Sequence, residues 1–355
     1  MLSLPLANCT LRLLAVVPTA KVTNFNKNSP EPVKKFINIL VKSVVPLFLG
    51  AALLYWIYRN YDFGQVFASL KGMDMWWFWL SCVFGVLGHV IRGWRWRLTL
   101  APLGYCPDSA NCVYSVYIAY AANLVVPRVG EVSRCIVLER YDKVPFAQSL
   151  GTLVSERLVD TLMVVLITLA AVLSQWGVFV AFVSEAGGGS SGAFSSVGRM
   201  AVLVLSFAAV CAVLYFAIRK MKLWARIRSF LARFWDGFTS LAKMRNSPLF
   251  IMETVGIWFC YFMQFYLCFF CFPFSSGLSL GAALLLFVAG SVAVVVPTPN
   301  GAGPWHFAVM SIMMLYGVAQ VDAGIFALIV HTLQTLLVAV LGIYGLMMLQ
   351  FKKTK

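Results

Sequence analysis

The chain has 355 residues, of which 61% are hydrophobic and only 12% are charged. Continuous apolar runs of about twenty residues recur along it, which excludes a soluble domain and an outer-membrane barrel of short alternating strands. The formal net charge of +15 comes from basic residues beside the apolar runs, as in cytoplasmic loops of membrane proteins, so we expect no nucleic-acid partner. Composition therefore predicts an all-α, polytopic membrane protein.

The first spanning helix is predicted over residues 36–58, after an N-terminal basic tail of residues 1–35. A second is predicted over residues 75–92 and begins with tryptophans that are typical of a membrane interface. Its other end reads IRGWRWR, which contains Arg92, Arg95 and Arg97. Two interpretations of these arginines stay open: a cytoplasmic anchor, or contact of one of them with a lipid phosphate.

The stretch of residues 120–160 concentrates ionisable side chains between apolar segments. They are Arg128, Glu131, Arg134, Glu156, Arg157 and Asp160. Such residues are expensive at membrane depth and usually face a protein interior or a hydrated cavity. Asn123, Pro127 and Gly130 interrupt the backbone here, which is tolerated only where the broken helix is buried in protein or lines a cavity. We therefore expect a substrate site in this stretch, with Asn123 as a further binding residue.

Within the predicted helix 145–175, Glu156 and Asp160 share one face, and Arg157 precedes Asp160 by three residues. Two interpretations stay open: an Arg157–Asp160 pair that locks helix packing, or the polar wall of a transport cavity. Arg128 and Arg134 follow the helix break, and their planar forks of donors match phosphate. We expect Arg134 to lie nearer to water than Asp160.

Further spanning helices are predicted over residues 199–218, 249–272 and 323–349, and a basic amphipathic helix on the cytoplasmic leaflet over residues 219–245. If residues 111–127 also crossed the membrane, the basic segment would face outward. A re-entrant element at 111–127 instead places both termini and all basic loops in the cytoplasm. The apolar pieces 281–297 and 305–317 then form a second re-entrant element from the opposite face, which gives about six spanning helices in all.

The two predicted breaks resemble each other, as VVPRVGE over residues 125–131 and VVPTPNG over residues 295–301. This similarity indicates an inverted repeat with the site between the broken helices. The prolines and glycines of the second break expose backbone groups to the cavity, and His306 follows them. A single histidine in apolar surroundings is expected in the core, although we keep it as a binding candidate. The candidates here are Pro297, Pro299, Gly301, Gly303 and His306.

Four motifs occur in order: IRGWRWR; Asn123 to Arg134; Ser155-Glu156-Arg157-x-x-Asp160; and PTPNGAG at 297–303. Together they resemble the flippase-like family related to the transmembrane region of lysylphosphatidylglycerol synthases, over about residues 35–349. The resemblance implies a lipid translocator of the bacterial inner membrane, without an aminoacyltransferase domain. Asn300 and His306 stand where that family usually has glycine and glutamate, so a carboxylate role cannot be transferred to this break.

We therefore expect a flippase-like domain over residues 36–351, a basic tail over 352–355, and membrane lipids with an anionic or phosphate-bearing headgroup as partners. We find no nucleophile–base pair, HExxH motif or clustered metal ligands, so we expect no enzyme activity and no cofactor. Cys268 and Cys271 form a CxxC pattern in an aromatic run, where packing is the expected role. The alternatives are a non-transporting partner of a cell-envelope lipid or glycan synthase, and an intramembrane enzyme.

Overall fold

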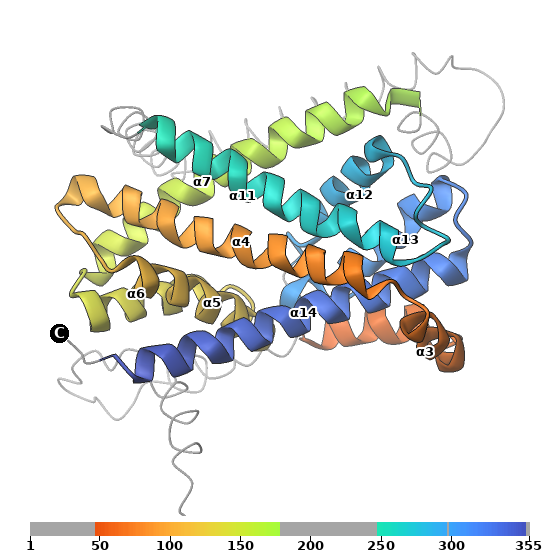
Figure 1. Cartoon of the computed structure of the whole chain (residues 1–355), viewed down its shortest axis with the longest axis horizontal. Coiled ribbons are helices and arrows are strands. Elements are labelled where there is room, and N and C mark those ends of the chain that lie inside the picture. Colours follow the sequence, from red (N-terminus) through yellow and green to blue (C-terminus); the bar gives the residue numbers. More distant parts are fainter. Residues whose placement is uncertain (1–46, 178–246, 297, 353–355) are drawn as a thin grey trace, which may run out of the picture. The chain divides into compact units, whose positions relative to one another are not determined.

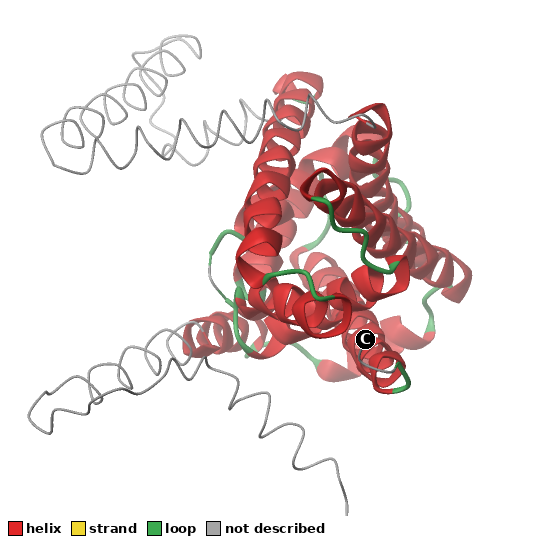
Figure 2. Ribbon diagram, turned by 90° about the vertical axis from the view of Figure 1, so that its left-hand side faces the viewer, coloured by secondary structure: helices red, strands yellow, loops and turns green. Residues whose placement is uncertain are grey.

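Helices make up the described part of the chain, which covers residues 47–177, 247–296 and 298–352 of a computed structural model and contains no strand (Figure 2). Four helices there are long and apolar enough to cross a membrane: Met75–Leu103, Phe146–Ser174, Ser247–Cys271 and Gln320–Gln350. Two shorter apolar helices are Leu47–Tyr58 and Leu280–Ala293. The expectation of an all-α polytopic membrane protein is confirmed.

The predicted helices agree with these spans except at one boundary. Three of them, 145–175, 249–272 and 323–349, match to within three residues. The helix predicted over 75–92 instead continues to Leu100, so two more turns carrying Arg95 and Trp96 lie inside it. Residues 1–46, and with them the start of the first predicted span, lie outside the described residues, as do 199–218 and 219–245.

The elements fall into two similar series (Figure 1). After α3 (Phe63–Lys71), the first series is α4 (Met75–Leu100) with the 3-10 turn η1 (Ala101–Leu103), α5 (Ser109–Val125), α6 (Val129–Asp142) and α7 (Phe146–Ser174). The second is α11 (Ser247–Leu267) with η2 (Cys268–Cys271), α12 (Leu280–Ala293), η3 (Pro299–Gly301), α13 (Pro304–Leu315) and α14 (Gln320–Gln350). Each series is a long helix, a hairpin of two short helices, and a second long helix.

Short polar side chains start several of these helices. Asp74 Oδ1 accepts a hydrogen bond from Trp76 N at 2.9 Å at the start of α4, and Asp108 Oδ1 accepts from Ala110 N at 2.9 Å at the start of α5. Ser279 caps α12 in the same way. Each cap satisfies one backbone N–H that the first turn leaves without a partner, so these residues fix where the helices begin.

The two series run in opposite directions. Ser81 Oγ of α4 donates to Gln264 O of α11 at 2.6 Å, and Arg95 Nη1 further along α4 donates to Thr254 Oγ1 of α11 at 3.2 Å. Residue numbers rise along α4 as they fall along α11, so these two first helices are antiparallel. The order of elements therefore repeats with inverted direction, as the inverted repeat predicted.

The hairpins enter from opposite ends of the long helices (Figure 1). Hairpin α5–α6 begins beside the end of α14, where Lys352 Nζ donates to Asn111 Oδ1 at 2.9 Å. Hairpin α12–α13 opens beside the end of α7, where Tyr316 OH donates to Gln175 Oε1 at 2.9 Å. The start of α7 lies next to the end of α4, where Trp96 Nε1 donates to Thr152 Oγ1, and α5 follows directly after α4. The first hairpin therefore opens near the start of α7 and the second near its end, so the two openings lie at opposite ends of α7.

The two breaks meet near the middle of α14. Asn300 Nδ2 in the second break donates at 2.9 Å to Oγ1 of Thr335, which lies midway along α14. Arg128 in the first break donates from Nη2 to Val295 O at 3.4 Å. Arg128 and Asn300 both have left-handed backbone angles, with φ of 67° and 49°. The hairpins therefore turn back at the middle of α14, which is the geometry of re-entrant elements.

Small residues let the first hairpin approach α14. A Cβ placed on Gly342 would lie 2.2 Å from Ala121 Cβ of α5, and one on Gly345 would lie 3.1 Å from Tyr114 O. Helices that lack a hydrophobic driving force between them, as in lipid, gain contact energy mainly through such close approach. Gly342 and Gly345 therefore hold α5 against α14.

Gly342→Ala is expected to destabilise the protein, because its new methyl group forces α5 away from α14, and overpacking of this kind costs about 1–3 kcal/mol. Gly151→Ala on α7 is the matched control, since a Cβ there meets nothing within 4 Å. Both changes bring the same gain in helix propensity, about 1 kcal/mol. Thermal unfolding of the purified proteins in detergent should show a lower midpoint for Gly342→Ala only. Equal midpoints would contradict the close-contact interpretation.

Candidate functional site

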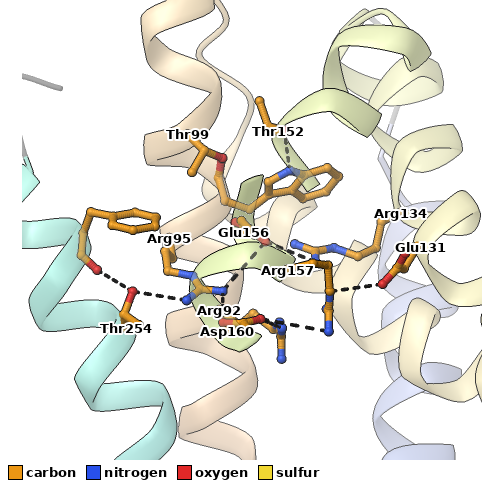
Figure 3. Close-up of polar contacts among 12 residues, drawn as sticks. Arg92, Arg95, Thr99, Glu131, Arg134, Thr152, Glu156, Arg157, Asp160 and Thr254 are labelled. Carbon is orange, nitrogen blue, oxygen red and sulfur yellow. Dashed lines mark hydrogen bonds and ion pairs between the residues drawn. The ribbon is translucent and has the colours of Figure 1, made fainter. Parts of the chain in front are cut away.

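Five ionisable side chains form a buried cluster where three helices meet (Figure 3). Helix α4 supplies Arg92 and Arg95, α6 supplies Arg134, and α7 supplies Glu156 and Asp160. None is more than 7% exposed, and Arg95 and Glu156 are fully buried. Three positive charges face two negative ones, so the cluster has a formal net charge of +1.

Asp160 is the best-paired member of this cluster. Its Oδ1 accepts a hydrogen bond from Arg95 Nη2 at 2.8 Å, and its Oδ2 accepts one from Arg92 Nη2. Arg92 Nη1 also donates to Tyr120 OH at 2.6 Å. Each carboxylate oxygen thus has its own arginine, and charged hydrogen bonds of this kind are the strong ones in protein interiors.

Glu156 and Arg134 make a looser pair one turn away. Arg134 Nη1 lies 3.5 Å from Glu156 Oε2, and neither side chain completes a hydrogen bond within the described residues. The Arg134 guanidinium instead stacks over the ring of Trp96, 4.1 Å from its centroid. An arginine over a tryptophan face is attracted by the ring quadrupole, so Trp96 stabilises a charge that hydrogen bonds leave incompletely satisfied.

The expectation for Arg134 was wrong, whereas the Arg157–Asp160 pair is present beside a shorter contact. Arg157 Nη1 lies 4.0 Å from Asp160 Oδ2 on its own helix, and Arg157 Nε lies 3.0 Å from Glu131 Oε1 on α6. Arg134 was expected nearer to water than Asp160, yet it is 2% exposed against 7%. The half-exposed pair is instead Arg157–Glu131, with side chains 42% and 43% exposed.

A cavity of about 430 Å³ lies between the two series of helices. The first series contributes the charged lining residues Arg92, Arg157 and Asp160. The second series contributes neutral polar ones, among them Asn300 of the second break and Gln334 of α14. Aromatic residues of α5, α11 and α13 complete the lining: Tyr120, Trp258, Tyr261, Phe265 and Trp305.

Several predicted candidates hold the first break together without lining this cavity. Asn123 Oδ1 accepts from Gly130 N at 2.8 Å, which fastens the end of α5 to the start of α6. A Cβ on Gly130 would lie 2.1 Å from Ala119 O, so glycine is required for that approach. Arg128 is exposed and contacts Val295 O, so its predicted contact with a phosphate stays a prediction.

The second break is shaped by glycines with left-handed backbones. Gly301 and Gly303 have φ of 74° and 92°, and Gly303 N donates to His306 Nδ1 at 3.3 Å. His306 is 2% exposed, as expected for a core histidine. Pro299 begins η3 beside them, whereas Pro297 lies outside the described residues. The residue of this break that lines the cavity is Asn300, which was noted only as a departure from the family pattern.

The main residues missed as site candidates are Arg92 and Arg95. Their spacing of three places them on one helix face, and Glu156 and Asp160 share a face by the same rule. Two arginines on one helix face and two carboxylates on another predict ion pairs between the helices. Because the predicted helix ended at residue 92, Arg95 was not placed on it and this prediction was not made. Cys268 and Cys271 are free, buried and packed among phenylalanines, which agrees with the packing interpretation.

These features define a polytopic membrane protein of inverted-repeat architecture, whose broken helices meet near the middle of α14 beside a cavity lined by aromatic and polar residues. The chain belongs to the lysylphosphatidylglycerol synthase TM region family, which matches residues 43–342. It is also similar to Glycosyltransferase AglD of Haloferax volcanii, with 28% identity over 166 residues, which are 43% of this chain. The match spans only 26% of the length of that relative. No solved structure matches the chain at a significant level.

Asp160→Ala is expected to lower stability by about 3–5 kcal/mol, because it leaves Arg92 and Arg95 buried without their carboxylate. Glu131→Ala is the control, since it breaks an ion pair whose members are both about two-fifths exposed. Exposed pairs contribute at most about 1 kcal/mol. The measurement is thermal unfolding of both variants in the same detergent. Similar losses of stability for the two would show that Asp160 is not a buried anchor.

Proposed function

We propose that this protein translocates lipids with a phosphate-bearing or otherwise polar headgroup, and that the headgroup passes through the cavity between the two repeats. The observation that carries the proposal is the position of this cavity. It is lined in part by Asn300 of the second break and lies next to two hairpins that enter from opposite ends. In inverted-repeat transporters the substrate site lies near the midplane, between broken helices.

The cavity has the size and lining for a headgroup. Its volume of about 430 Å³ falls within the range of about 300–1,000 Å³ that is usual for small-molecule sites. Arg92 and Arg157 line it, and guanidinium groups bind phosphate through paired donors. The acyl chains remain in the bilayer while the headgroup moves, so the protein supplies a polar path for the headgroup alone.

The proposal involves no covalent chemistry. Asp160 is engaged by two arginines, and Glu156 lies behind the cavity beside Arg134 and Arg95. A general acid or base must be able to take or give the proton that it moves. Asp160 lines the cavity, but both of its oxygens accept hydrogen bonds from arginines, and Glu156 is not part of the lining. We therefore propose that the protein is not an enzyme and that its partners are membrane lipids.

A second function is favoured by one specific observation. The curated relative is named as a glycosyltransferase, and this chain matches about a quarter of its length. A membrane domain of this family can therefore occur within a protein named for glycan synthesis. The alternative is a non-transporting partner of a cell-envelope lipid or glycan synthase.

The test of transport is movement of acyl-labelled fluorescent phosphatidylglycerol in proteoliposomes, read as the fraction that dithionite quenches over time. Arg157→Gln should slow it about tenfold, since a hydrogen bond to a charged group contributes about 1.5–3 kcal/mol. The transport rate of Arg157→Lys should lie between those of the wild type and Arg157→Gln, because lysine keeps the charge but loses the planar fork of donors. Arg140→Gln, an exposed arginine at the far end of α6, is the matched control.

The outcomes separate the candidate functions. Wild-type protein that moves no lipid would remove translocation and leave the synthase-partner alternative. Transport that is unchanged in Arg157→Gln would show that this arginine does not contact the headgroup. A new lipid species in the mass spectrum after incubation would show an enzyme instead.

We also propose that the protein lies in the bacterial inner membrane with both termini in the cytoplasm, so that hairpin α5–α6 opens to the cytoplasm. Cys106 is exposed at that end, between α4 and α5, and Gly277 is exposed at the opposite end, before α12. In a background with the other cysteines replaced, an impermeant maleimide should label Gly277→Cys in intact cells. Cys106 should react only after the membrane is opened. The reverse pattern would invert the proposed topology.

A further inference from the structure

We infer that the cavity takes a phosphate-linked headgroup rich in hydroxyls, such as a polyol or sugar, and that it rejects a cationic aminoacylated headgroup. This inference rests on the proposed function, because it names the class of lipid that the same cavity would carry. It is drawn from the charges, the unused hydrogen-bonding groups and the aromatic surfaces of the lining.

The charges of the lining oppose a cation. The charged residues there are Arg92, Arg157 and Asp160, so its formal net charge is +1 with the histidines counted as neutral. Both oxygens of Asp160 are already engaged by Arg92 and Arg95. An ammonium group in the cavity would therefore leave water without gaining a counter-ion, and an unpaired charge pays a large desolvation penalty.

Two donors of the lining have no hydrogen-bond partner within the described residues. They are Arg92 Nε and Trp258 Nε1, and both are buried. Both residues line the cavity. Guanidinium and indole N–H groups donate and do not accept, so these two groups require a ligand made of acceptors. A phosphate monoester or diester has acceptor oxygens and a negative charge, and it satisfies both requirements.

Among the neutral lining residues of the second repeat, donors and acceptors are mixed. His331 Nε2 must donate to Asn300 O, 3.0 Å away, because a carbonyl oxygen only accepts. In the neutral ring this leaves Nδ1 of His331 as an acceptor. Asn300 donates from Nδ2 to Thr335 Oγ1, which leaves Oδ1 of Asn300 as an acceptor for a ligand. Gln334 Nε2 makes a 3.9 Å contact with Cys268 Sγ. Hydroxyl groups both donate and accept, so they match this set and phosphate oxygens do not.

Aromatic rings in the lining suit a ring that carries hydroxyls. Trp258, Tyr261 and Trp305 line the cavity together with the polar groups. A polyol or sugar ring has C–H groups on its faces and hydroxyls on its rim, so it can pack on such surfaces while its rim forms hydrogen bonds. An apolar wall with a few placed polar groups is the usual design of a specific small-molecule site.

The decisive comparison uses acyl-labelled phosphatidylinositol, which carries a ring of hydroxyls on its phosphate, and acyl-labelled lysyl-phosphatidylglycerol, which is cationic. In proteoliposomes with wild-type protein, phosphatidylinositol should move about tenfold faster, the effect of one charged hydrogen bond gained or lost. Equal rates, or faster movement of the cationic lipid, would overturn the inference while leaving lipid translocation intact.

Binding separates the failure of this inference from the failure of translocation. If no lipid moves, native mass spectrometry of the protein with each lipid still tests the headgroup class. Preferential binding of phosphatidylinositol supports the inference, and equal or weaker binding overturns it. Soluble inositol 1-phosphate tests the source: binding of this compound without binding of phosphatidylinositol would support the chemistry and overturn a lipid as its carrier.

Gln334→Glu provides a gain-of-function test, because it adds a carboxylate to the cavity lining without changing the size of the side chain. The ratio of lysyl-phosphatidylglycerol to phosphatidylinositol transport, or of binding, should rise about tenfold. Gln350→Glu is the control, since it makes the same change at an exposed position outside the cavity on the same helix. An unchanged ratio in a folded Gln334→Glu protein overturns the inference. If that variant does not fold, Gln264→Glu, which also lines the cavity, decides in the same way.

Discussion

The ion pairs of Asp160 with Arg92 and Arg95 are the constraint on which the rest of the structure depends. They join α4 to α7 within the first repeat, and Arg95 extends the same network to Thr254 on α11 of the second repeat. A carboxylate at this depth is tolerable only with its charge balanced and its oxygens bonded, so these helices cannot separate or rotate freely. The network therefore fixes the wall against which the cavity is formed.

The two repeats contribute unlike chemistry to the cavity. The first repeat contributes charge through Arg92, Arg157 and Asp160, and the second contributes neutral polar groups through Asn300, His331 and Gln334. An architecture that is similar in both halves thus carries unlike side chains at its interface. This asymmetry gives the lining a charged set and a neutral set of polar groups, and it limits which headgroups could fit.

Much of the fold followed from hydrophobic run length and loop charge. The spans near α7, α11 and α14 were predicted closely, because about twenty apolar residues between polar ones permit few other structures. The end of α4 at Leu100 was not predicted, because the IRGWRWR motif resembles an anchor at the membrane interface. Whether an arginine there faces lipid phosphates or a buried aspartate depends on Asp160, which lies 65 residues further along the chain from Arg95. Local pattern does not contain that information, and for the same reason Trp258, His331 and Gln334 carried no signal.

The contact of Arg128 with the carbonyl of Val295 has a consequence that concerns helix dipoles. Val295 follows Val294, the C-cap residue of α12, at the terminus where the last backbone carbonyls of a helix lack partners and the helix dipole is negative. Arg128, at the start of α6, places a cation at this terminus from the opposite hairpin. The tips of the two hairpins are thereby attracted electrostatically, through a single 3.4 Å hydrogen bond from an exposed side chain. A single hydrogen bond from an exposed cation to a helix terminus orients the two hairpin tips toward each other, and it is weak enough for thermal motion to break.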